Sequence, residues 1–91
     1  MNKETFLIQA KTLIQQFESY VPVGDEVLDS RQIIYAIRTV KQMIHWVLND
    51  AVPPRRMRHM VLTRMALDEW PIGHPFSRGV NKIEEAFLGL P

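Results

Sequence analysis

The side chains best suited to binding chemistry in this sequence are basic and aromatic residues between positions 31 and 64. Tyr35 and Trp46 lie within about 20° of each other when the segment is drawn as a helix, and Arg38 and His45 run beside them. Such a row can anchor a partner protein, because aromatic and arginine side chains dominate many interfaces. It can also follow a nucleic-acid backbone while the rings stack on bases. The candidate partner-binding residues are Tyr35, Arg38, Gln42, His45 and Trp46.

A second basic group follows two consecutive prolines. It falls at the start of a predicted helix, where positive charges oppose the helix dipole. This placement indicates an anion, a phosphate backbone or an acidic protein surface at that end, bound by arginine side chains and helix amides. The alternative is that acidic residues elsewhere in the fold neutralise the group. The candidate anion-binding or nucleic-acid-binding residues are Arg55, Arg56, Arg58 and His59.

The spacings that catalysis and metal binding require are missing from the chain. His45, His59 and His74 are dispersed, with no His-Glu-x-x-His spacing, no glycine-rich phosphate loop and no Gly-x-Ser-x-Gly turn. The sequence has no cysteine, which excludes a thiolate nucleophile, a thiolate metal site and a disulfide framework. We therefore expect a protein that is not an enzyme, with no catalytic residues, no metal site and no cofactor.

Charge is unevenly distributed along the 91 residues, although the formal net charge is only +1. Seven of the 11 lysine and arginine residues lie between positions 31 and 64, where Asp50 is the only acidic residue. The segments on either side are acidic. This asymmetry favours an interaction surface, unless acidic and basic helices neutralise each other within the fold.

Four helices are predicted to position these side chains. Apolar residues recur at intervals of three and four, and proline and glycine interrupt the pattern. Asp29 or Ser30 is the expected N-cap of the second helix, and Ser77 that of the last. We expect an all-α fold in which residues 1–91 form a single, compact, four-helix bundle-like domain with sequential helices antiparallel. The predicted helices cover residues 3–20, 30–50, 54–70 and 78–89.

The predicted third helix carries apolar residues on several faces. Met57, Val61 and Met65 form one stripe, and further apolar side chains lie on both sides of it. Such a helix requires burial on more than one side. It therefore occupies the centre of the bundle or is covered by a second protein molecule.

These features favour a small protein-binding module that acts as a regulator, inhibitor, adaptor or assembly subunit through its second and third helices. Self-association is a further expectation. The alternative is a nucleic-acid-binding protein that uses the basic segment 31–64, mainly through phosphate contacts. No membrane partner is expected. The longest apolar stretch covers only residues 33–37, whereas a helix that spans a membrane needs about 20 apolar residues. The absence of cysteine and of a signal-peptide pattern favours a cytoplasmic location. Periodicity leaves open whether Tyr35 and Trp46 are exposed or belong to the core.

Overall fold

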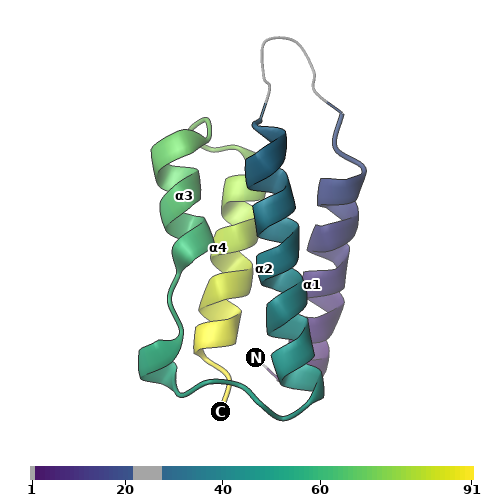
Figure 1. Cartoon of the computed structure of the whole chain (residues 1–91), viewed down its shortest axis with the longest axis vertical. Coiled ribbons are helices and arrows are strands. Elements are labelled where there is room, and N and C mark those ends of the chain that lie inside the picture. Colours follow the sequence, from purple (N-terminus) through teal and green to yellow (C-terminus); the bar gives the residue numbers. More distant parts are fainter. Residues whose placement is uncertain (1, 22–27) are drawn as a thin grey trace.

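The computed structural model describes residues 2–21 and 28–91. Helices account for 73% of the described residues, and none of those residues lies in a strand. Neighbouring α-helices along the chain run in opposite directions (Figure 1). The predicted all-α, four-helix architecture is confirmed. The elements are α1 (Lys3–Glu18), α2 (Ser30–Leu48), the short 3-10 helix η1 (Arg55–Met57), α3 (Val61–Glu69) and α4 (Pro75–Leu88).

Side-chain caps define the starts of α1 and α2. The side chain of Asn2 accepts a hydrogen bond from the backbone N–H of Thr5 at 2.8 Å. Asp29 accepts one from the N–H of Arg31, also at 2.8 Å, as predicted for this end of α2. Both helices begin at the predicted residue and end two residues early. At the end of α2, Asp50 adopts a φ of 50°, which breaks the helical path.

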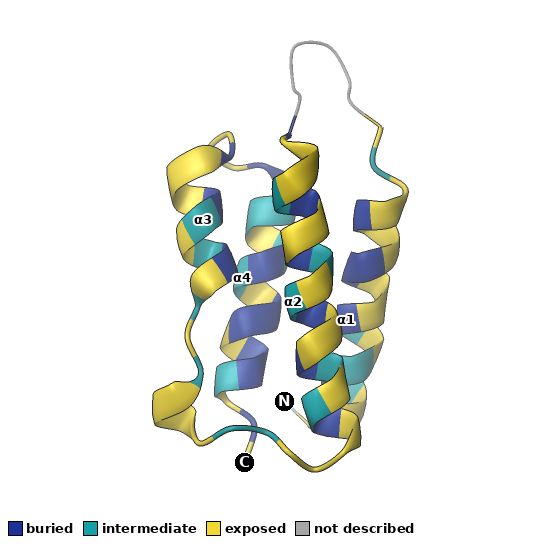
Figure 2. Cartoon of the chain, in the orientation of Figure 1, coloured by how far each residue is buried: buried dark blue, intermediate teal, exposed yellow. Residues whose placement is uncertain are grey.

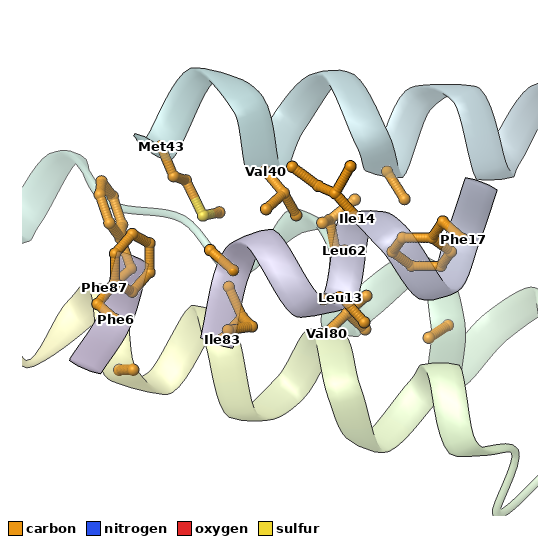
Figure 3. Close-up of a cluster of buried hydrophobic side chains, with 14 of the residues drawn as sticks. Phe6, Leu13, Ile14, Phe17, Val40, Met43, Leu62, Val80, Ile83 and Phe87 are labelled. Atoms are coloured by element: carbon orange, nitrogen blue, oxygen red, sulfur yellow. The ribbon is translucent and has the colours of Figure 1, made fainter. Parts of the chain in front are cut away.

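The core lies where α1 packs against both α2 and α4 (Figure 3). Phe6 of α1 meets Phe87 of α4 with ring centroids 5.7 Å apart. Gly79 allows α4 to approach α1 closely, because a Cβ at this position would lie 2.9 Å from Cδ1 of Leu13. One large side chain from each of the four α-helices is completely buried, together with Leu90 after α4: Phe6, Val40, Leu62, Val80 and Leu90.

The predicted helix 54–70 is shorter in the structure. Residues 55–57 form η1, the chain then runs in an irregular path, and α3 begins only at Val61. The break occurs at Arg58, whose extended backbone directs its guanidinium to carbonyl groups at the end of α4. Pro54 therefore precedes a single 3-10 turn and does not begin a long α-helix.

The last helix begins earlier than predicted. The ring Nδ1 of His74 accepts a hydrogen bond from the N–H of Phe76 at 3.0 Å, and Pro75 occupies the first helical position. Proline is well suited to this position because its fixed φ is helical and its missing N–H has no partner there. Ser77, the predicted cap, lies inside the first turn of α4.

The described helices include none with the length and apolar character needed to cross a membrane.

Candidate partner-binding groove

A groove lies between α2 and the segment that contains η1 and α3. Two adjoining hollows, of about 610 and 410 Å³, form it. Tyr35, His59 and Val61 line both hollows, so the two are continuous. We call this feature the α2–α3 groove. Its α2 wall consists of Gln32, Tyr35, Arg38, Thr39, Gln42, Met43 and Trp46. Its opposite side consists of Pro53, Met57, Arg58, His59, Met60, Val61, Arg64, Met65, Asp68, Glu69 and Phe87.

The groove exists because α3 packs closely on α4, and α2 packs closely on α1. Much of α3 is therefore exposed, whereas α1, α2 and α4 each turn a buried stripe toward the core (Figure 2). Leu62 and Ala66 are the buried residues within α3. The sequence predicts a third helix that is covered on several sides, but in the structure α3 is covered on one side only and does not occupy the centre of the bundle.

The side of the groove near η1 is strongly apolar. Trp46 is half-buried and stacks on Phe87, with ring centroids 6.0 Å apart and planes 24° apart. Large parts of Tyr35, Met57 and Val61 remain exposed, at 46%, 58% and 39% of their surfaces. Aromatic and methionine side chains are typical of the centre of protein interfaces. The groove therefore offers apolar and aromatic side chains to a partner at the end near η1.

A buried carboxylate fixes the first turn of α3. Glu84 of α4 is only 2% exposed, and it accepts hydrogen bonds from the N–H of Leu62 at 2.9 Å and from the N–H of Thr63 at 2.6 Å. It also accepts one from the hydroxyl of Thr63 at 2.7 Å. No side chain within α3 caps this end, so the carboxylate of α4 replaces a local cap and faces the positive end of the α3 dipole.

Arg58 fixes the segment that leads into α3. Its guanidinium donates to the carbonyl oxygens of Pro53, Phe87, Leu88 and Leu90 at 2.6–3.0 Å. It also lies 5.6 Å from the centre of the Phe87 ring. Desolvation and the nearby charge of Arg55 lower the pKa of this side chain from its usual value. Arg58 thus ties the segment to the C-terminal end of α4.

The far end of the groove is held by a hydrogen bond between its walls. Nε1 of Trp70 donates to the side-chain oxygen of Gln32 at 2.9 Å. Trp70 itself is buried directly after α3. This hydrogen bond therefore joins α2 to the end of α3, while Arg58 holds the η1 segment to α4 at the other end of the groove.

The predicted partner-binding residues reach the groove with one exception. Tyr35, Arg38, Gln42 and Trp46 line it. His45 does not, because it lies on the outer side of α2, where its ring is 3.4 Å from the amide nitrogen of Asn49.

The four residues predicted to bind an anion lie in three different surroundings in the structure. Arg58 lines the groove, but its guanidinium is engaged by backbone carbonyls. His59 lines both hollows and is exposed. Arg55 and Arg56 are exposed on η1, outside the groove lining, and form no ion pair within residues 2–21 and 28–91.

Several residues of the groove escaped prediction. Phe87 has the spacing of a core residue, and nothing in the sequence connects it with Trp46. Asp68 and Glu69 line the end of the groove opposite η1, both exposed. The helical stripe of Met57, Val61 and Met65 was visible in the sequence, but only the fold shows that all three residues face α2.

Among the described residues, no cluster of three or more histidine, aspartate or glutamate side chains could hold a metal ion. Compared with known protein families, with curated proteins and with solved structures, the chain matches none significantly. Its function must therefore be argued from the groove itself.

Proposed function

We propose that the chain is a non-enzymatic protein-binding module that takes up a segment of another protein in the α2–α3 groove. One observation carries the proposal. The exposed surfaces of Tyr35, Met57 and Val61 and the half-buried Trp46 lie in one continuous groove, and a hydrogen bond joins α2 to the end of α3 at its far end. A groove with aromatic and apolar side chains at one end is suited to apolar anchors of a partner. Self-association and a cytoplasmic location stay predictions from the sequence.

Nucleic-acid binding by segment 31–64 has less support. Arg58 is engaged by carbonyl groups, so its guanidinium is not available to phosphates. Asp68 and Glu69 stand at the end of the groove opposite η1, where they would repel a phosphate backbone. Arg55 and Arg56 remain exposed on η1, and such binding would act through them together with the other exposed cations of the segment: Arg31, Arg38, Lys41 and Arg64.

Selection of peptides from a random display library tests the proposal without knowledge of the partner. Selected peptides are expected to bind Tyr35→Ala and Met57→Ala at least tenfold more weakly than the unchanged protein, which corresponds to about 1.4 kcal/mol. Neither residue belongs to the buried core, since Tyr35 is 46% and Met57 58% exposed, so we expect both variants to keep the fold. Leu67→Ala is the matched control, because Leu67 is 78% exposed on α3 but lies outside the groove.

Two results would contradict the proposal. One is that selected peptides bind the Tyr35→Ala and Met57→Ala variants as tightly as the unchanged protein. The other is that no peptide is selected, while labelled oligonucleotides bind with a steep salt dependence that Arg55→Gln and Arg56→Gln flatten.

A further inference from the structure

We propose that the occupant of the α2–α3 groove is an amphipathic helix of a partner protein, with acidic residues near its C-terminal end and its axis parallel to α2. This inference rests on the proposed function, because it specifies what the same groove binds. Three features of the described residues carry it: the length of the groove, the charges at its two ends and the way this chain uses its own apolar surface.

The length and walls of the groove match a short helix. On α2 the lining extends from Gln32 to Trp46, which at 1.5 Å per residue is about 21 Å. A helix of about 14 residues, or four turns, has the same length. The walls are themselves helical, and among the described residues no strand offers an edge to an extended peptide. Docking of an amphipathic helix is therefore the recognition mode that this geometry favours.

The groove has opposite charges at its two ends. Arg55 and Arg56 lie on η1, just outside the lining at one end, and His59 lines the groove where its two hollows meet. Asp68 and Glu69 lie at the other end, in the last turn of α3. Arg64 is one turn closer to the middle. None of these six side chains forms an ion pair within the described part of the chain, so the charges of the three arginines, Asp68 and Glu69 remain available to a partner.

These charges determine the direction of the occupant. The C-terminal end of a helix carries partial negative charge and the N-terminal end partial positive charge. The C-terminal end therefore belongs beside Arg55 and Arg56, and the N-terminal end beside Asp68 and Glu69. Acidic side chains in the last turns would add charge-assisted contacts with the two arginines. Because α2 also ends on the η1 side, the occupant lies parallel to α2 (Figure 1).

A second copy of this chain is a poor occupant. The five buried residues of α1 form its apolar stripe, and they are covered within its own core. The apolar stripes of α2 and α4 are buried in the same way. Within the described residues, the buried stripes of α1, α2 and α4 are therefore not available to enter the groove of another copy. We therefore place in the groove a segment of a different protein and not the core stripe of a second copy.

Two synthetic helical peptides test the direction. Both contain 15 residues with the same composition, the same leucine and phenylalanine stripe, and blocked ends. One has lysine in its first turn and glutamate in its last two turns, and the other has these charges exchanged. By fluorescence anisotropy, the peptide with C-terminal glutamates is expected to bind at least tenfold more tightly. The double variant Arg55→Glu/Arg56→Glu should abolish or invert this preference. The control Lys11→Glu/Lys82→Glu changes the net charge equally at exposed positions outside the groove and should preserve it.

A nitroxide at the C-terminus of the tighter peptide reports its direction. It should broaden the amide signals of η1, and broadening at Asp68 and Glu69 would overturn the inference. Equal binding of both peptides, lost in each case in Tyr35→Ala, would overturn the proposed direction and leave the proposed function standing. Failure of both peptides to bind would overturn the helical occupant, and the display selection then decides separately whether the groove binds protein at all.

Discussion

Replacing Glu84 by alanine removes the carboxylate that fixes the first turn of α3. In the structure this group is 2% exposed and accepts three hydrogen bonds from Leu62 and Thr63. Hydrogen bonds to a charged group contribute about 1.5–3 kcal/mol each, and they are not additive when they share one acceptor. Because the substitution also leaves buried N–H groups without a partner, we expect a loss of about 3–5 kcal/mol in the free energy of unfolding.

This loss is a large part of the total, since a chain of this size has a stability of about 5–14 kcal/mol. Glu84→Gln provides a milder test, because the amide keeps the shape and one acceptor oxygen but loses the charge. We expect it to cost about 1.5–3 kcal/mol. Glu85→Ala is the matched control, because the neighbouring side chain is exposed on the same helix. It should change stability by no more than about 0.5 kcal/mol.

Urea unfolding followed by circular dichroism measures these differences, and amide hydrogen exchange locates them. Amides of α3 should exchange faster in Glu84→Gln. The amides of α1 should still exchange only through global unfolding, so their protection should fall by no more than the loss of overall stability. A short helix of nine residues is not stable in isolation, so loss of its anchor should release it as a unit. The reasoning would be refuted if Glu84→Ala and Glu85→Ala had equal stability, or if α3 kept its full protection in Glu84→Gln.

Two further substitutions test other parts of the fold. Arg58→Met keeps much of the apolar stem of the side chain but removes four hydrogen bonds to backbone carbonyls. We therefore expect the free energy of unfolding in urea to fall by about 2–4 kcal/mol, and the amides at the end of α4 to exchange faster. Unchanged protection of these amides would contradict the anchoring role of Arg58. The hydrogen bond and charge of Lys3 lower the pKa of the Asp50 carboxyl, so the pair stabilises the fold above the ordinary pKa of aspartate and this contribution disappears as the pH falls through the lowered value. Asp50→Asn should therefore be less stable than the unchanged protein at neutral pH and low salt but equally stable in acid, and a difference independent of pH would refute the assignment.

The helices α1 and α2 could be predicted because their apolar residues recur on one face and their starts carry local signals. Asn2 and Asp29 cap the helices that follow them within two or three residues, so the sequence contains both partners of each contact close together. The break between η1 and α3 could not be predicted in this way. It depends on contacts that Arg58 makes with the end of α4 and Glu84 makes with the start of α3, between residues 21 to 32 positions apart along the chain.

The candidate site was predicted in part for a related reason. Helical spacing placed Tyr35 and Trp46 on one side of α2, but it could not determine which helix covers that side. In the structure Phe87 of α4 covers part of Trp46, whereas Tyr35 stays 46% exposed beside the gap to α3. The seven-residue spacing from Arg38 predicts that His45 lies in the same row, yet in the structure His45 lies just outside the groove.

The interactions that shorten the predicted third helix also account for the groove. Glu84 and Arg58 bind backbone groups, and both attach the segment before and within α3 to α4. If α3 packed closely against α2 instead, Tyr35 would be buried and no apolar surface would be available to a partner. The groove and the stability of α3 therefore depend on the same buried polar contacts. Glu84→Gln should consequently lower both the affinity for peptides and the stability of α3, although Glu84 is buried and does not line the groove.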